Sequence, residues 1–210
     1  MGSVNEPPRI AGLRLAAEAS AWGRAGFAVA GDELVVGSVP IRLGRETGWT
    51  LAGVASADLD GLPTETIEIA GAPVPGGHPL GVTRIDHIVV LTPSLQRTID
   101  AFERAGISCR RGRENGGPSG DLRQAFFRLG EVIVEAVEAV GDEDDGPARF
   151  WGVTFAVADL DAAAARLGPL CAPVRDAVQP GRRIAPLRRE AGLGMPVALI
   201  SDDTIATRPD

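Results

Sequence analysis

Apolar runs and amphipathic stretches follow one another in a fixed order from residue 84 to residue 138. Residues 85–92 (IDHIVVLT) are rich in β-branched side chains, which predicts a strand. Residues 93–106 predict a helix, with Ser94 as its N-cap and Gly106 as its terminator. The apolar residues of this helix recur at helical spacing: Leu95, Ile99, Phe102 and Ala105.

Three further strands are predicted after this helix. They are residues 107–113, 122–129 and 131–138, and a Gly-rich loop from Asn115 to Gly120 separates the first two. Gly130 joins the last two tightly. The predicted order is therefore β-α-β-β-β.

The same order is repeated after an acidic, Gly-containing linker at residues 141–147. Residues 151–157 predict a strand and residues 158–168 an Ala-rich helix, with Asp159 near its start. The three further strands are residues 170–176, 182–188 and 196–201. Because the offset between the copies differs by three residues between the first strand and the helix end, we expect the second helix to be about one turn shorter.

The N-terminal part predicts a third, more degenerate copy. Its strand, short helix and three strands fall at residues 9–16, 17–26, 27–37, 39–44 and 48–55. We therefore divide the chain into a degenerate βαβββ module and a Pro/Gly-rich linker with one strand at residues 65–71, followed by two βαβββ modules. The predicted bounds are 1–60, 61–83, 84–140 and 148–205.

Composition narrows the class of partner. The formal net charge of −7 argues against nucleic acid or an anionic membrane as the main partner. No apolar run reaches the roughly 18 residues of a membrane span, and the N-terminus lacks the pattern of a secretory signal. We therefore expect a cytoplasmic protein. All of the basic residues are Arg, which suggests a GC-rich bacterial genome, and Cys109 and Cys171 are expected to be reduced, partly buried thiols.

The tandem β-α-β-β-β duplication resembles the vicinal-oxygen-chelate superfamily, which includes glyoxalases, bleomycin-resistance proteins and extradiol dioxygenases. The resemblance is carried by IDHIVV, by the helix ending in ERAGI, by the hairpin FFRLGEVIVEAVE, and in the second copy by VTFAVADLDAAAARLG and PVALIS. It implies an α+β fold in which tandem βαβββ modules form curved mixed sheets around a cleft.

The resemblance also implies where a metal would be bound. Each module of a metal-dependent member contributes one ligand from its first strand and one from its last, and the matching positions here are His87 and Glu135. An imidazole and a carboxylate suit one divalent Zn, Ni, Fe or Mn ion, with Glu135 also the candidate catalytic carboxylate. The second module has Gly152 and Ile200 at these positions, and neither binds a metal.

Each candidate residue also has a structural interpretation. In this interpretation, His87 is a satisfied core or cleft histidine beside a surface Asp86, and Glu135 is an ion-pair partner of Arg123 or Arg128 on the neighbouring strand. Alternatively, His87 and Glu135 are polar groups of a metal-free ligand cleft. The only other histidine, His78, lies in the Pro/Gly-rich linker.

Arginines and one tryptophan are the remaining candidates for binding a ligand. Arg182, Arg183, Arg188 and Arg189 cluster around residues 182–188. They are either solvated strand ends or, for Arg182 and Arg189, groups that bind an anion in the cleft. Arg123 and Arg128 on the neighbouring module are further candidates for binding the ligand. Trp151 is either a core residue or a stacking surface for the ligand.

Three functions are consistent with these observations. The first is a metal-assisted lyase, isomerase or dioxygenase of the glyoxalase type, with a small molecule bound in the cleft between modules. The second is metal-free binding, or sequestration, of a small molecule. The third is a non-catalytic dimerisation module, since an odd number of modules leaves a sheet edge that favours a homodimer. The sequence does not name the ligand.

Overall fold

The computed structural model describes residues 7–68, 77–115, 122–139 and 145–202. Its strands form two mixed sheets, of five strands (β1–β5) and of eight strands (β6–β13). The chain divides into two compact units, and the boundary between them falls within β1, β6 and β10. Unit 1 comprises residues 1–13, 47–71 and 87–151, and unit 2 comprises residues 14–46, 72–86 and 152–210.

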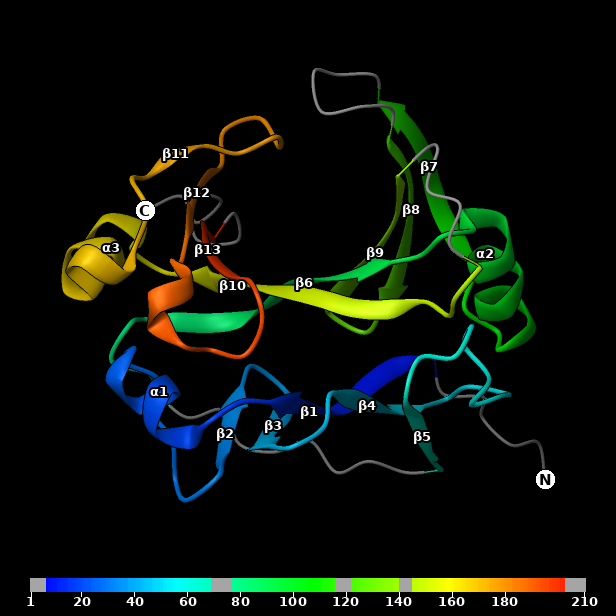
Figure 1. The fold of residues 1–210 in the computed structure, drawn as a ribbon, viewed down its shortest axis with the longest axis horizontal. Helices are drawn as coiled ribbons and strands as arrows, with labels where there is room; N and C mark the ends of the chain where they lie inside the picture. Colours follow the sequence, from blue (N-terminus) through cyan, green and yellow to red (C-terminus); the bar gives the residue numbers. More distant parts are fainter. Residues whose placement is uncertain (1–6, 69–76, 116–121, 140–144, 203–210) are drawn as a thin grey trace, which may run out of the picture. The chain divides into compact units, whose positions relative to one another are not determined.

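The first βαβββ repeat lies mainly in unit 1. Strands β6 and β9 pair in parallel, and β9, β8 and β7 continue as an antiparallel meander (Figure 1). The helix α2 packs against β7, β8 and β9. The elements are β6 (Val82–Leu91), α2 (Leu95–Arg104), β7 (Cys109–Asn115), β8 (Leu122–Leu129) and β9 (Val132–Ala139).

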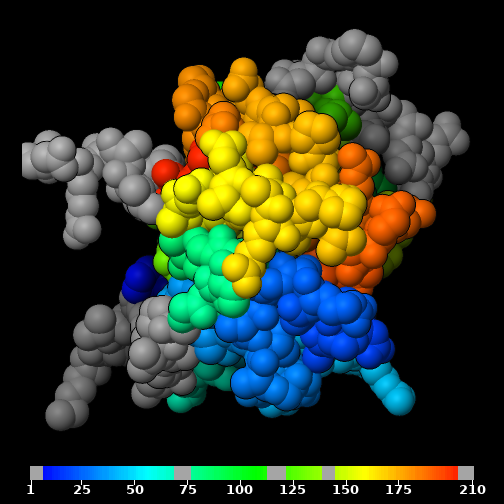
Figure 2. Space-filling model, turned by 90° about the vertical axis from the view of Figure 1, so that its left-hand side faces the viewer, coloured from blue at the N-terminus to red at the C-terminus, as the bar shows by residue number. Residues whose placement is uncertain are grey.

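The second βαβββ repeat, mainly in unit 2, has the same topology. Strands β10 and β13 pair in parallel, β13, β12 and β11 pair antiparallel, and α3 packs against β12 and β13. Figure 2 shows α3 (yellow) and the segment that follows it (orange) at the surface of this unit. The elements are β10 (Arg149–Val157), α3 (Leu160–Leu167), η1 (Gly168–Leu170), β11 (Arg175–Asp176), β12 (Arg183–Pro186), η2 (Arg189–Ala191) and β13 (Val197–Ser201).

The shared pairing pattern confirms the predicted α+β class and the tandem βαβββ repeat. Within the second repeat, the strand predicted at residues 170–176 is reduced to β11 and to an isolated bridge between Cys171 and Leu187. Pro173 accounts for the shortening, because it has no backbone N–H to donate to a neighbouring strand. Parts of the predicted Gly-rich loop at 115–120 and of the acidic linker at 141–147 lie outside the described residues.

The N-terminal segment contains the predicted strand, short helix and three strands. They are β1 (Arg9–Ala16), α1 (Ala19–Arg24), β2 (Glu33–Val36), β3 (Val39–Gly44) and β4 (Gly48–Ala52). Strand β4 pairs in parallel with the linker strand β5 (Thr64–Ile67), whereas β2 and β3 form an antiparallel hairpin. This parallel pairing is the relation that β6 has to β9, so β4 and β5 resemble the first and last strands of a reduced module.

Each unit has an aromatic core that contains a tryptophan from the N-terminal segment. In unit 1, Trp49 is fully buried, with its ring centroid 4.9 Å from that of Phe150 and 6.1 Å from that of Phe102. In unit 2, Trp22 is fully buried, with its centroid 4.7 Å from Phe27 and 5.9 Å from Phe155. The N-terminal segment is therefore part of both hydrophobic cores.

The two long helices begin in different ways. Ser94 has the extended backbone of an N-cap, but its side chain makes no capping hydrogen bond. Instead, the Glu138 carboxylate accepts a hydrogen bond from the Leu95 N–H at 2.9 Å. In α3, Asp159 accepts one from the Ala162 N–H at 3.0 Å. No helix in the described part of the chain is long and apolar enough to span a membrane.

Candidate functional site

One face of the unit 1 sheet is only partly covered. Along β6 and β9 burial alternates, with Ile88, Val90, Val134 and Ala136 buried and the residues between them half-buried. Because successive side chains of a strand point to opposite faces, the half-buried residues share one face. We call it the open face; its side chains on β6, β9 and β8 are His87, Val89, Leu91, Ile133, Glu135, Val137, Gln124, Phe126 and Arg128.

The strand register arranges these side chains in three rows across the sheet. The first row is Arg128, Ile133 and His87, the second is Phe126, Glu135 and Val89, and the third is Gln124, Val137 and Leu91. His87 and Glu135 therefore lie on the same face of adjacent strands, one row apart.

Glu135 has a partner that the sequence analysis did not identify. The Gln124 side-chain amide donates a hydrogen bond from Nε2 to Glu135 Oε1 at 2.5 Å. This bond joins neighbouring rows and orients the carboxylate. The pattern of LRQAFFRL gave a usable signal, because Gln124 alternates with Phe126 and Arg128 and so belongs to the same face.

The two arginines predicted beside Glu135 lie in different surroundings. Arg123 forms an ion pair with Glu138 at 3.1 Å, and Glu138 also caps the helix α2. Arg123 thus supports the helix start. Arg128 is exposed on the open face, opposite Ile133 and in the row of His87.

Trp151, at the start of β10, is 47% exposed, so it is not a core residue.

The second module has no equivalent donor pair. The expected counterpart of His87, Gly152, is buried, and a Cβ there would lie 2.8 Å from the Pro196 carbonyl oxygen. This position therefore has no room for a side chain. The strand register pairs Thr154 with Ala198, as Val89 pairs with Glu135, so the counterpart of Glu135 is Ala198 rather than Ile200.

Arg182 lies in a buried ion-pair network of unit 2. Its guanidinium donates to Asp86 at 2.8 Å and to the Ser201 carbonyl oxygen, and its side chain is 10% exposed. Asp86, expected at the surface, is only 4% exposed and also pairs with Arg84 at 3.0 Å. That expectation was wrong because two guanidinium groups compensate the buried carboxylate. Arg182 is not a solvated strand end, and a ligand would have to compete with Asp86 for it.

The other three arginines of the cluster are exposed. Arg183 forms two hydrogen bonds with Asp161, at 3.0 and 2.7 Å. This hydrogen bonding lowers the pKa of the Asp161 carboxyl below its ordinary value. Arg188 and Arg189 follow at the start of η2.

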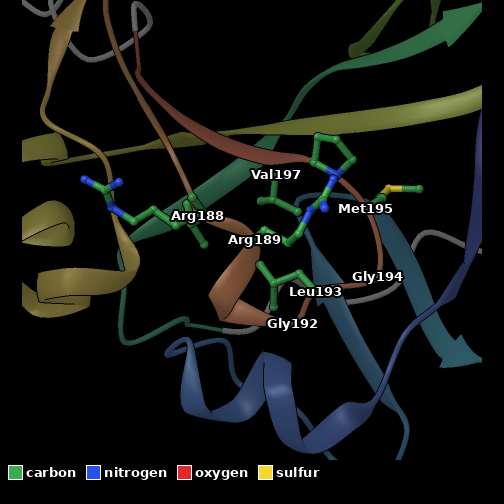
Figure 3. Close-up of a pocket in the computed structure, with 9 residues that line it drawn as sticks. Arg188, Arg189, Gly192, Leu193, Gly194, Met195 and Val197 are labelled. Atoms are coloured by element: carbon green, nitrogen blue, oxygen red, sulfur yellow. The ribbon is translucent and has the colours of Figure 1, made fainter.

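Arg188 and Arg189 line a pocket of about 530 Å³ in unit 2 (Figure 3). The pocket is formed by the loop between β12 and β13, and its lining is Leu187, Arg188, Arg189, Gly192, Leu193, Gly194, Met195, Pro196 and Val197. Of the residues predicted to bind substrate, only Arg189 belongs to it.

Histidines and cysteines complete the set of metal-binding side chains. His78 is buried in unit 2, where its Nδ1 accepts from the Ala28 N–H and its Nε2 lies 2.7 Å from the Val35 carbonyl oxygen. Cys109 is half-buried and Cys171 buried, and burial raises the pKa of the Cys171 thiol. Within the described residues, no group of three or more His, Cys, Asp or Glu side chains could hold a metal ion.

Comparison with known proteins identifies the fold. No family model matches the chain, and no curated protein matches it. Among solved structures, a mutant 4-hydroxymandelate synthase from Streptomyces coelicolor matches with a TM-score of 0.65 and 14% identity, over 93% of this chain and 92% of that one.

Methylmalonyl-CoA epimerases match a smaller part of the chain. The epimerase from Mycobacterium tuberculosis has a TM-score of 0.48 and 17% identity, over 61% of this chain and 94% of that one. An epimerase from Streptomyces coelicolor in complex with 2-nitronate-propionyl-CoA has a TM-score of 0.47 and 22% identity, over 58% and 96%. The synthase match, across nearly all of both chains, confirms the predicted vicinal-oxygen-chelate fold; at 14% identity it establishes the fold alone.

Proposed function

We propose that this chain binds a small apolar molecule with adjacent hydroxyl and carboxylate groups on the open face of unit 1. The observation that carries the proposal is the shared face of His87 and Glu135, with Phe126 beside the carboxylate and Arg128 in the row of the imidazole. No resident metal is required for this binding.

The chemistry of the rows supports that class of ligand. A carboxylate oriented by Gln124 accepts a hydrogen bond from a ligand hydroxyl. A guanidinium pairs with a ligand carboxylate, and the imidazole of His87 can donate to the same group. Phe126 supplies an apolar, aromatic surface next to Glu135.

Mandelate is a suitable probe because it carries a ring, a hydroxyl and a carboxylate on adjacent carbons. The chain has two histidines, His78 and His87, so a histidine-labelled sample gives two ring signals, and His87→Ala assigns them. We expect mandelate to shift the His87 signal and leave that of His78 unchanged. Phenylacetate, which lacks the hydroxyl, should bind on the order of ten-fold more weakly.

Two variants distinguish specific binding at this site from nonspecific binding of the acids. Glu135→Ala should remove the preference for mandelate over phenylacetate, because it removes the acceptor of the hydroxyl. Glu138→Gln is the matched control, since Glu138 is on the same strand but pairs with Arg123. Equal binding of the two acids to the parent protein, or a preference that survives Glu135→Ala, would contradict the proposal.

A metal-assisted lyase, isomerase or dioxygenase is the second candidate function. It is favoured by the placement of one imidazole and one carboxylate on a single face. Catalytic metal sites usually have about three protein ligands, and the described residues offer two at this face, with the second module closed at Gly152. These donors do not by themselves fit a resident catalytic metal.

Metal analysis of purified protein tests the second candidate. Stoichiometric Zn, Ni, Fe or Mn that is lost in both His87→Ala and Glu135→Ala would support it. Protein that is metal-free as purified and shows no heat of binding with zinc or nickel chloride would refute it.

Sedimentation of the same samples tests the proposed homodimer, which would appear at twice the mass of the chain.

A further inference from the structure

The loop between β12 and β13 forms a pocket that the open face does not include. Its apolar walls are Leu187, Leu193, Met195, Pro196 and Val197, of which Leu193 and Val197 are buried. Its volume of about 530 Å³ falls within the range of small-molecule sites, which is roughly 300–1,000 Å³.

Backbone contacts hold the walls of this pocket in place. The Leu187 N–H donates to the Val197 carbonyl at 2.8 Å, and the Val153 N–H donates to the Pro196 carbonyl at 3.0 Å. Gly194 has a φ of 80°, and a Cβ there would collide with the Ala16 carbonyl oxygen. The loop therefore lies against the end of β1 at a distance that only glycine allows, and the pocket is largely pre-formed.

The arginines at the pocket differ from the other arginines of this region. Arg182 and Arg183 form ion pairs with Asp86 and Asp161, whereas neither Arg188 nor Arg189 forms one within the described residues. Glu190 follows Arg189 on η2 and does not pair with it in this part of the chain.

The side chains of Arg188 and Arg189 leave η2 in different directions. In Figure 3, Arg189 extends toward the side of the loop that carries Met195 and Val197, and Arg188 extends the opposite way. Arg188 also interacts electrostatically with the thiol of Cys171, and Cys171 does not line the pocket. Arg189 is therefore the cation presented to the apolar walls.

We infer that this pocket binds a small carboxylate with an alkyl chain, the carboxylate pairing with Arg189 and the chain lying along Leu193, Met195 and Val197. A guanidinium forms a bidentate pair with a carboxylate, and burial of each methylene adds to the affinity. The site lies wholly in unit 2 and does not depend on the ligand proposed for unit 1.

Octanoate is the probe, and Met195 is the reporter. The chain has two methionines, so a sample labelled at the methionine methyl gives two signals, of Met1 and Met195, and Met195→Leu assigns them. We expect octanoate to shift the Met195 signal saturably, and octanol and acetate to bind at least ten-fold more weakly. Octanol lacks the charge and acetate lacks the chain.

Arg189→Gln should weaken octanoate binding on the order of ten-fold, the effect of losing one charge-assisted pair. Arg166→Gln is the matched control, because it makes the same change of charge at an exposed residue of α3 outside the pocket lining and should leave the affinity within about two-fold. Octanol binding as tightly as octanoate would overturn the inference, as would equal effects of the two substitutions or an unshifted Met195 signal.

Discussion

Asp60 is a buried carboxylate on which several segments of unit 1 converge. Its side chain is 6% exposed and accepts hydrogen bonds from Arg97 Nε and Thr98 Oγ1, each at 2.6 Å. Its own carbonyl accepts from the Ala148 N–H at 2.9 Å. Arg97 in turn donates to the Gly146 carbonyl at 2.6 Å, so this residue links α2 to the segment that leads into β10.

Asp60→Asn should destabilise the protein by about 1–3 kcal/mol, because it leaves the partly buried Arg97 without its counter-charge. Asn tolerates the backbone at this position, where φ is 55°, so the substitution changes the charge and not the conformation. Urea unfolding monitored by circular dichroism measures the difference.

The control is Glu33→Gln, which removes the charge of an exposed pair. Arg42 and Glu33 are 2.6 Å apart, with side chains 65% and 58% exposed, and such pairs contribute about 0–1 kcal/mol. Equal losses in the two variants would mean that Asp60 does not anchor unit 1.

Asp161 gives a second prediction, about pH. Its pKa is lowered by the hydrogen bond from Arg183, so the ionised form is favoured in the folded state. The pair therefore stabilises the fold above the unfolded pKa of about 3.9, and this contribution is lost as pH falls through the folded pKa. In Arg183→Gln, a carboxyl-carbon NMR titration should show the Asp161 pKa moving up toward its ordinary value. An unchanged titration would refute the pairing in solution.

At the level of elements, close backbone approaches decide which positions accept a side chain. Gly152 on β10 faces the Pro196 carbonyl, and Gly194 faces Ala16 with a left-handed φ. Gly23, within α1, has nothing within 4 Å of the place where its Cβ would be.

Alanine at these three glycines should therefore have opposite effects. Gly152→Ala and Gly194→Ala should each destabilise by roughly 1–3 kcal/mol, through overpacking and, at Gly194, backbone strain. Gly23→Ala should stabilise by about 0.5–1 kcal/mol, because alanine costs less entropy in a helix. Thermal unfolding of the three variants measures the sign of each stability change. A destabilising Gly23→Ala would contradict the prediction.

The elements themselves were largely predictable from sequence, because both repeats keep clear periodicity and helix ends. Sequence alone could not give the register of the last strands. The two modules are offset by 65 residues at the first strand (Gly152 and His87) but by 63 at the last (Ala198 and Glu135), since loops between them differ in length. Side-chain partners from distant segments, such as Arg182 for Asp86, leave no local signal.

At the scale of the whole molecule, the N-terminal segment contributes to both cores. Trp49 packs on Phe102 and Phe150 in unit 1, and its Nε1 donates to Thr64 Oγ1 at 2.7 Å. Trp22 packs on Phe155 in unit 2. Both tryptophans are fully buried, so the tandem repeat alone would leave the faces of Phe102 and Phe155 uncovered.

A fragment of residues 80–202, which keeps both βαβββ repeats, should therefore fail to fold stably. It loses both buried tryptophans, each worth roughly 3–5 kcal/mol, against the about 5–15 kcal/mol by which a domain is usually stable. We expect poor dispersion of its amide NMR signals and no cooperative urea transition, whereas the full chain shows both. Trp22→Ala and Trp49→Ala in the full chain test the two tryptophans separately from the loss of the N-terminal strands. Each should lower the unfolding midpoint without removing a strand. A cooperatively folded fragment, or two variants as stable as the parent, would show that the repeats carry their own core and that the N-terminal sheet is an appendage.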